Sequence, residues 1–156
     1  MNRQIAVIAG PTAVGKTKFA IEAARSLDGE IISCDSMQLY RYMDIGSAKP
    51  TPEEMAQAVH HLVDVIDPSQ PFSAAMYQKM AKEAIEEVFS RGKLPIISGG
   101  TGLYLNTLIY DMDFSGADRD DRLRLELEEE ARANGPEVLH RRLEELDQAA
   151  AERIHP

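Results

Sequence analysis

Four short apolar runs alternate with segments in which apolar residues recur at helical spacing. The runs cover residues 5–9, 30–33, 61–66 and 94–98, and their length and composition are typical of buried parallel strands. Helices are predicted over residues 18–27, from a capping box at Thr51, from Ser73 to Gly92, and through Ile109. Since strands and helices alternate, we expect an α/β fold with a parallel sheet flanked by helices.

The pattern changes from about Asp118 onward. Three consecutive helices are predicted over residues 118–133, 136–146 and 147–154, with Gly135-Pro136 as the break between the first two. We therefore expect two domains, an α/β core over residues 1–117 and a small helical lobe over residues 118–156. Because the chain stops directly after a predicted helix, we expect it to be a fragment whose core lacks its C-terminal elements.

One loop carries the strongest signal of chemistry. Its residues are Gly10, Pro11, Thr12, Ala13, Val14, Gly15, Lys16 and Thr17, which match the phosphate-binding pattern G-x-x-x-x-G-K-[ST]. This phosphate loop follows a predicted strand and opens a predicted helix, where backbone N–H groups and the helix dipole favour an anion. Lys16 would reach terminal phosphate oxygens and the Thr17 hydroxyl would be a ligand of Mg²⁺. The loop predicts a P-loop NTPase-like core that binds a diphosphate or a nucleotide such as ATP.

Two other loops leave the carboxyl ends of predicted strands, where parallel sheets bind their ligands. They cover residues 34–41 and 99–102, and we expect both to converge with the phosphate loop on one cleft. Asp35 could be an Mg²⁺-linked acid, a general base toward an acceptor, or the cap of a short helix that begins near Ser36. Thr101 could donate its hydroxyl and N–H to a phosphate or a leaving oxygen, or be an ordinary turn residue.

Several other polar residues favour structural interpretations. Lys49 is interpreted as a solvated lysine in preference to a phosphate contact. His60-His61 is interpreted as a structural pair, because no further ligands stand at metal spacing. Cys34, the only cysteine, excludes a disulfide within one chain and is interpreted as a packing residue.

Composition narrows the expected partners and compartment. The 156 residues carry a formal net charge of −9, which argues against nucleic-acid binding driven by bulk electrostatics but leaves room for a local basic groove. No apolar run approaches the length of a membrane span, and no signal peptide is visible before the first strand. We expect a monomeric, cytoplasmic protein with no membrane partner.

Six segments together resemble the tRNA dimethylallyltransferase (tRNA isopentenyltransferase) family. They cover residues 10–17, 35–41, 44–50, 60–68, 99–104 and 153–156. The resemblance spans essentially the whole chain. Its most specific parts are Asp-Ser-Met-Gln from Asp35 and Gly-Gly-Thr-Gly-Leu-Tyr from Gly99. Since chains of this family continue well beyond the position of Pro156, the resemblance implies the N-terminal part of such a protein.

The resemblance implies transfer of a dimethylallyl group from dimethylallyl diphosphate to N6 of the adenosine just 3′ of the anticodon in tRNA. The phosphate loop would hold the leaving diphosphate, with Mg²⁺ as cofactor. Asp35 and Thr101 would be the catalytic residues, with Asp35 acting on the adenine amino group as base or orienter. Contacts with the anticodon stem-loop, around a flipped-out base, would come from Asp35, Ser36, Met37, Gln38, Thr101 and Arg124.

Three alternatives stay open. A small-metabolite P-loop kinase of the shikimate-kinase type also carries an acid after its second strand, but it needs an arginine-bearing lid that the sequence does not display. An adenylate isopentenyltransferase uses the same donor, although the helical lobe from Asp118 favours the tRNA enzyme. A non-catalytic nucleotide- or diphosphate-binding fragment would fit a truncated chain.

Overall fold

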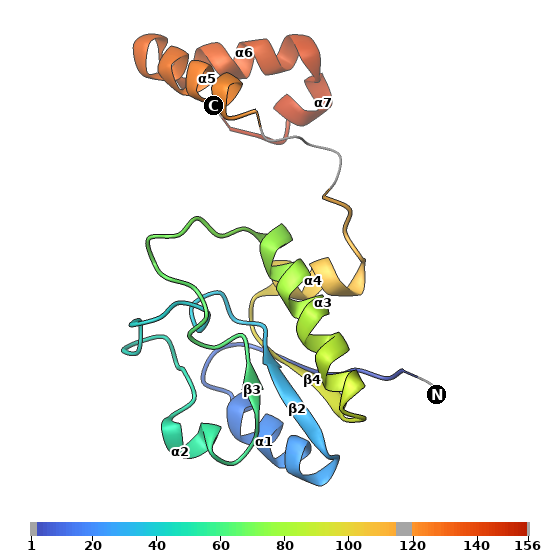
Figure 1. Ribbon diagram of the computed structural model, residues 1–156. Helices are drawn as coiled ribbons and strands as arrows, with labels where there is room; N and C mark the ends of the chain where they lie inside the picture. Colours follow the sequence, from blue (N-terminus) through green and yellow to red (C-terminus); the bar gives the residue numbers. More distant parts are fainter. Residues whose placement is uncertain (1–2, 115–119, 156) are drawn as a thin grey trace. The chain divides into compact units, whose positions relative to one another are not determined.

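The computed structural model describes residues 3–114 and 120–155 and divides into two compact units (Figure 1). The first unit is Met1–Asp113 and the second is Phe114–Pro156. The predicted domain boundary between residues 117 and 118, and the predicted helix start at Asp118, lie outside the described residues.

The first unit is built on a four-stranded sheet. Its strands are β1 (Ala6–Ala9), β2 (Gly29–Ser33), β3 (His60–His61) and β4 (Leu94–Gly99). They pair in the order β1-β4-β2-β3, and every pairing is parallel. The sheet confirms the predicted α/β class. Because all four strands run the same way, the loops that follow β1, β2 and β4 leave the same edge of the sheet.

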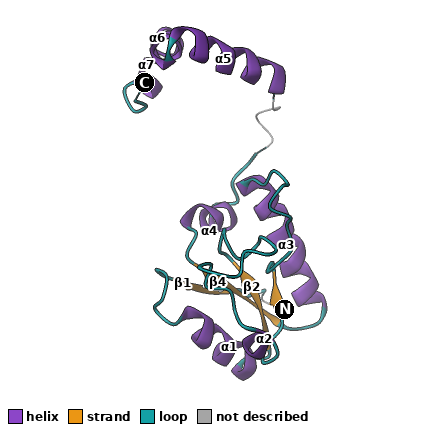
Figure 2. Ribbon diagram, turned by 90° about the vertical axis from the view of Figure 1, so that its left-hand side faces the viewer, coloured by secondary structure: helices purple, strands orange, loops and turns teal. Residues whose placement is uncertain are grey.

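Helices cover both faces of this sheet, as Figure 2 shows. The helix α1 (Lys16–Ser26) packs Ala20, Ile21 and Ala24 against Ile31 and Ile96 on one face. On the other face, α3 (Ala74–Ser90) and α4 (Gly102–Ile109) enclose the larger core cluster. Side chains in a strand alternate between faces, so neighbouring residues of β2 and β4 serve different cores.

The ends of the predicted helices follow local chemistry. The capping box is present at α2 (Pro52–Met55), where the Thr51 hydroxyl accepts from Glu54 N and the Glu54 carboxylate accepts from Thr51 N. The Ser73 hydroxyl accepts from Met76 N at the start of α3. In contrast, α1 begins at Lys16 and not at the predicted residue 18, because Gly15 in its left-handed conformation lets the loop enter the helix directly.

The prediction of a strand over residues 61–66 is wrong beyond His61. The backbone of Leu62 (φ 60°) and Asp64 (φ 56°) is left-handed, which an extended strand cannot accommodate. Pairing resumes only as a single bridge between Tyr40 and Ile66. Leu62, Val63 and Ile66 are buried all the same, which is why their pattern resembled that of a strand.

The second unit contains three helices in its described part. They are α5 (Asp121–Asn134), α6 (Pro136–Leu146) and α7 (Gln148–Ala151). Asp120 caps α5, and Gly135 ends it with φ 85° directly before Pro136 starts α6. The last helix is shorter than the predicted range of 147–154.

Across the described residues, no helix combines the length and the apolar character that a membrane crossing requires.

Candidate functional site

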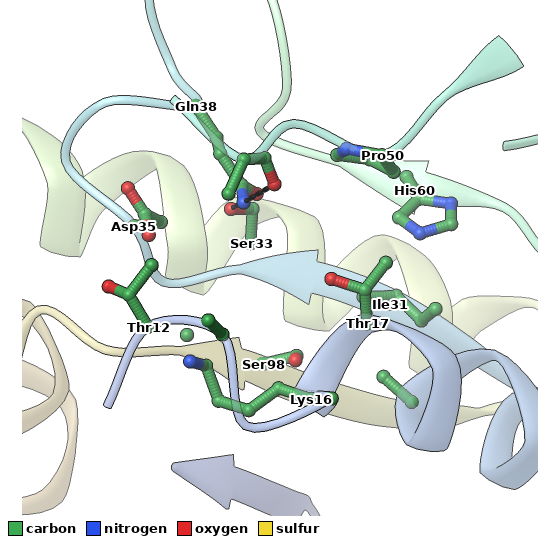
Figure 3. A pocket seen from close by; sticks show the side chains of 15 residues that line it. Thr12, Lys16, Thr17, Ile31, Ser33, Asp35, Gln38, Pro50, His60 and Ser98 are labelled. Carbon is green, nitrogen blue, oxygen red and sulfur yellow. Dashed lines mark hydrogen bonds between the residues drawn. The ribbon is translucent and has the colours of Figure 1, made fainter. Parts of the chain in front are cut away.

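One cavity of about 290 Å³ lies at the carboxyl edge of the sheet, below the predicted loops. Its lining residues come from the phosphate loop and α1 (Thr12, Ala13, Gly15, Lys16, Thr17, Ala20), from β2 and the loop after it (Ile31, Ser33, Asp35, Gln38), from the segment before β3 and its first residue (Ala48, Pro50, His60), and from β4 (Ser98, Gly99). Figure 3 shows Lys16 and Thr17 on one side and Asp35 and Gln38 on the other. The cavity thus unites residues from all three predicted loops.

The phosphate loop has the backbone of an anion-binding turn. Gly15 adopts φ 89° at the N-cap of α1, and Ala13 adopts φ 67° two residues earlier. The first helical N–H groups lack partners within the helix, so they are available to an anion at the cavity. Lys16 folds back, and its Nζ donates to Pro11 O at 2.6 Å. A phosphate group would replace this neutral acceptor with a charged one.

Asp35 is separated from the end of β2 by Cys34 alone and is partly exposed at the cavity. Its Oδ1 accepts a hydrogen bond from Met37 N at 2.9 Å, as in an Asx turn. The residues after it, 36–39, form a turn, so the predicted short helix is absent there although the carboxylate does cap the local backbone. The Asx bond fixes one carboxylate oxygen and orients the group beside the phosphate loop.

The turn after Asp35 is bonded to the loop after β4. The Thr101 hydroxyl accepts from Ser36 N at 2.9 Å and lies 3.3 Å from the Ser36 hydroxyl. Thr101 N donates to Cys34 O at 3.1 Å. A Cβ at Gly99 would lie 2.0 Å from Cys34 O, so this close approach requires glycine. Thr101 lines a smaller neighbouring hollow of about 150 Å³ with Gly10, Pro11, Gly100 and others.

Gln38 is held at both ends of its amide. Its Oε1 accepts from the Ser33 hydroxyl at 2.9 Å, and its Nε2 donates to Ala48 O at 2.9 Å. Met37, the residue before it, is exposed. Gln38 therefore joins the turn after β2 to the segment before α2, and both sides of that joint line the cavity.

Lys49 is not the solvated lysine that we predicted. Its side chain is only 6% exposed, and its Nζ donates to Tyr40 O at 2.7 Å, to Asp44 Oδ1 at 2.9 Å and to Asp64 Oδ1 at 2.5 Å. Burial works against the charge, but the two carboxylates outweigh it and raise the pKa of Lys49. Asp64 lies 15 residues further along the chain, so local sequence could not reveal the pairing.

His60 lines the cavity, which the sequence did not predict. Its Nδ1 lies 2.8 Å from Ala58 O, so Nδ1 carries the proton. Burial lowers the pKa of His60, which favours the neutral ring. The structural interpretation fits His61, whose Nε2 lies 2.7 Å from the buried Glu30 carboxylate. The two histidines separate because adjacent strand residues face opposite sides of a sheet.

The remaining predicted site residues lie elsewhere. Val14 is exposed on the phosphate loop. Arg124 belongs to the second unit, on α5, where its side chain is 67% exposed and its Nε donates to Glu128 Oε1 at 3.0 Å. Cys34 is buried in the core, and burial raises the pKa of its thiol, as expected for a packing residue.

The cavity has the donor chemistry that Mg²⁺ prefers. Thr17, Ser33 and Asp35 supply hydroxyl and carboxylate oxygens, and magnesium in phosphate sites is held by one or two such groups together with substrate phosphates and water. Among the described residues, no group of three or more His, Cys, Asp and Glu side chains forms a cage for a metal. The residues of the cavity therefore suit a metal ion that is also bound by a phosphate ligand.

The family model of the IPP transferases matches residues 38–156 of this chain. Among similar curated proteins, the tRNA dimethylallyltransferase of Acetivibrio thermocellus is 54% identical over 151 residues, which is 97% of this chain and 48% of the relative. That of Alkaliphilus oremlandii is 53% identical over 156 residues, which is 100% of this chain and 50% of the relative. The chain thus spans about half the length of the curated relatives it matches.

Solved structures of tRNA-modifying transferases also align with nearly the whole chain. A full-length tRNA isopentenylpyrophosphate transferase from Bacillus halodurans aligns with a TM-score of 0.72 and 47% identity over 99% of this chain and 51% of its own. A eukaryotic dimethylallyltransferase acting on tRNA aligns with a TM-score of 0.84 and 32% identity over 99% of this chain and 38% of its own. These neighbours support the predicted P-loop NTPase-like fold. They are prenyltransferases, which disfavours the kinase alternative.

Proposed function

The chain belongs to the IPP transferase family, and we propose from this that its protein transfers a dimethylallyl group from dimethylallyl diphosphate to N6 of an adenosine in tRNA. The acceptor is the adenosine just 3′ of the anticodon, presented in the anticodon stem-loop. One observation carries the proposal: the phosphate loop and Asp35 line the same cavity, so a donor and an acceptor can meet there.

The donor diphosphate binds on the phosphate loop. Lys16 and the N–H groups at the start of α1 neutralise its charge, and this helps the allylic carbon to lose diphosphate as a leaving group. Thr17, which lines the cavity, would hold Mg²⁺ through its hydroxyl. When bound, that metal supplies further charge neutralisation. Lys16 exchanges its present hydrogen bond to Pro11 O for a charge-assisted bond to the donor.

The acceptor adenine binds on the opposite side of the cavity. A base within an RNA loop must leave its stack to reach such a pocket. The Asp35 carboxylate accepts a hydrogen bond from the N6 amino group and thereby orients its nitrogen toward the allylic carbon. The bond between that carbon and the diphosphate oxygen breaks, and the bond from N6 to the carbon forms. Asp35 takes one proton from N6, and diphosphate leaves.

The loop around Asp35 is held for this task. The Ser36 backbone is bonded to the Thr101 hydroxyl, and the Gln38 amide is bonded to Ser33 and Ala48, so hydrogen bonds hold the turn that would contact the flipped base. Thr101 lies next to the acceptor and the diphosphate. Arg124 contributes a contact with the RNA backbone from the second unit. The protein acts as a monomer in the cytoplasm, a reducing compartment in which a lone thiol such as Cys34 stays free.

Diphosphate release tests the proposal. The full-length protein is incubated with dimethylallyl diphosphate, Mg²⁺ and a stem-loop RNA that carries either adenosine or a purine lacking the 6-amino group at the target position. We expect release only with adenosine, and loss of donor binding in Lys16→Met but not in Lys18→Met, whose side chain is exposed outside the cavity. Equal diphosphate release with both RNAs, or phosphate transfer from ATP, would contradict prenyl transfer to N6.

A further inference from the structure

The loop between β2 and α2 displays large apolar side chains to solvent. In Figure 1 it is the cyan segment that reaches to the left of the view. Tyr42 is 79% exposed and Ile45 is fully exposed. Single exposed apolar side chains are ordinary, but two within four residues leave apolar area in water that contact with a partner would bury.

The backbone of Tyr42 adopts an unfavourable conformation. Its φ is 65°, in the left-handed region that an aromatic residue rarely occupies, at a cost of roughly 1–2 kcal/mol. The surrounding structure imposes this conformation. The preceding residue is fixed on both sides, since Arg41 N donates to Ile66 O at 2.8 Å and Arg41 Nε donates to Asp64 O at 3.0 Å. The chain therefore turns at Tyr42 and points its ring outward.

A buried ammonium group anchors the rest of the loop. Lys49 draws together Tyr40 O, Asp44 and Asp64, and the Ser47 hydroxyl donates to Met43 O at 2.5 Å. The Lys49 side chain is buried although both carboxylates are partly exposed, so loss of these partners would leave its charge uncompensated. The loop is thus rigid where it is anchored and apolar where it is exposed, which is the character of a preorganised contact surface.

This surface is continuous with the candidate site. The loop begins after Gln38 and ends at Ala48 and Pro50, and all three residues line the cavity. Gln38 Nε2 donates to Ala48 O at 2.9 Å, which ties the two ends of the loop together. The loop that carries Tyr42 therefore begins and ends at the cavity.

We propose that Tyr42 is a stacking platform for an unpaired base of the acceptor RNA next to the base that enters the cavity. This inference rests on the proposed function. Extruding one base interrupts the stack of its neighbours, and an aromatic ring restores a stacking partner without reading the sequence. The exposed Arg41 side chain lies beside the ring in sequence and supplies a positive charge for the RNA backbone. Ile45 extends the apolar surface.

Four variants of the full-length protein distinguish the effect of the Tyr42 ring from the effect of the left-handed backbone at this residue. Tyr42→Phe keeps the ring. Tyr42→Gly removes the ring and relieves the left-handed backbone, so it should fold at least as well as the wild type. Tyr42→Ala removes the ring but keeps the unfavourable conformation. Tyr110→Ala is the matched control, because Tyr110 is similarly exposed (73%) and ends α4, at the opposite end from Thr101.

The measurement is binding of a stem-loop RNA that carries 2-aminopurine beside the target adenosine. With the wild type and Tyr42→Phe, we expect quenching of the fluorophore on binding. With Tyr42→Gly and Tyr42→Ala, we expect loss of the quenching and an approximately 10-fold rise in the Kd and in the KM for RNA, with the KM for dimethylallyl diphosphate unchanged. Tyr110→Ala should behave as the wild type.

The two proposals fail in different ways. If the wild type modifies the RNA and Tyr42→Gly has the same KM for RNA and the same quenching, the stacking platform is wrong and the proposed function stands. If the wild type neither binds nor modifies the RNA, both are wrong. The platform would also be wrong if Tyr42→Gly raised the KM for RNA but quenched the fluorophore as strongly as the wild type does. The ring would then contribute to binding without stacking on the base.

Discussion

The Thr101 hydroxyl accepts a hydrogen bond from the backbone N–H of Ser36 at 2.9 Å. The two residues are 65 positions apart in the sequence and follow the ends of β4 and β2. The bond therefore links the loop after β2 to the loop after β4 at the carboxyl edge of the sheet. The adjacent bond from Thr101 N to Cys34 O makes the connection double. The position of Asp35, between Cys34 and Ser36, is therefore set by the loop after β4.

Replacing Thr101 tests this connection. Thr101→Val keeps the shape of the side chain but removes the acceptor for Ser36 N, which should cost about 1 kcal/mol of stability and lower prenyl transfer by roughly 10-fold or more as Asp35 loses its alignment. Thr101→Ser should recover most of the activity. The measurement is kcat and the KM for each substrate in both variants. Equal activity of the valine and serine variants would show that the hydroxyl has no role.

The last residue of β4 and the first residue of α4 are glycines whose substitution should change stability in opposite directions. Gly99→Ala places a Cβ 2.0 Å from Cys34 O, which forces β4 and the loop after β2 apart, so we expect a loss of several kcal/mol, as for other overpacked sites. A Cβ at Gly102 meets no atom within 4 Å, and alanine at the start of α4 should raise stability by about 0.5 kcal/mol. Urea unfolding of both variants measures the difference. Similar midpoints would contradict the close approach at Gly99.

Asp35→Asn separates chemistry from local structure. The asparagine amide oxygen can still accept from Met37 N, so the turn after β2 should persist, whereas the variant cannot take a proton from the adenine amino group. We expect kcat for prenyl transfer to fall at least 100-fold while affinity for dimethylallyl diphosphate stays close to wild type. Calorimetric titration of the donor, together with single-turnover kinetics, measures both. If donor affinity falls instead, Asp35 belongs to the Mg²⁺ site.

The buried Glu30 makes stability depend on acid pH. Hydrogen bonds from Arg91 lower the pKa of Glu30 against the opposing effect of burial, and His61 adds to the lowering, so that the pKa falls from 4.5 to about 2. Because the folded pKa is depressed, this stabilisation is complete above pH 4.5 and is lost as the pH falls through about 2. Urea midpoints between pH 6 and pH 2 should fall less steeply in Glu30→Gln. Parallel curves for the two proteins would exclude this role of Glu30.

Much of the fold was predictable because its signals are local. Apolar runs predicted β1, β2 and β4, and capping residues such as Thr51 and Ser73 predicted helix starts, since both depend on residues within a few positions. The prediction of a strand over residues 61–66 was wrong because an apolar pattern reports burial and not an extended backbone. The left-handed backbone of Leu62 and Asp64 cannot be recognised from that pattern.

The site was predictable to the level of loops but not of contacts. Parallel strands send their following loops to one edge, which explains the meeting of the phosphate loop with Asp35. The contacts of Lys49 and the position of His60 were not predicted. Those of Lys49 depend on a carboxylate 15 residues away, and the position of His60 depends on which face of a two-residue strand each histidine occupies. The bond between Thr101 and Ser36 likewise required the assembled sheet.

The most direct test of the account is the intact mass of an anticodon stem-loop RNA after incubation with the full-length protein, Mg²⁺ and dimethylallyl diphosphate, in parallel with ATP as donor. We expect a gain of one dimethylallyl group with the first donor, no change with ATP, and no gain with Lys16→Met. Nuclease digestion should place the group on the adenosine 3′ of the anticodon. An unchanged RNA mass with dimethylallyl diphosphate, or a phosphorylated product with ATP, would contradict the claim that this cavity performs prenyl transfer.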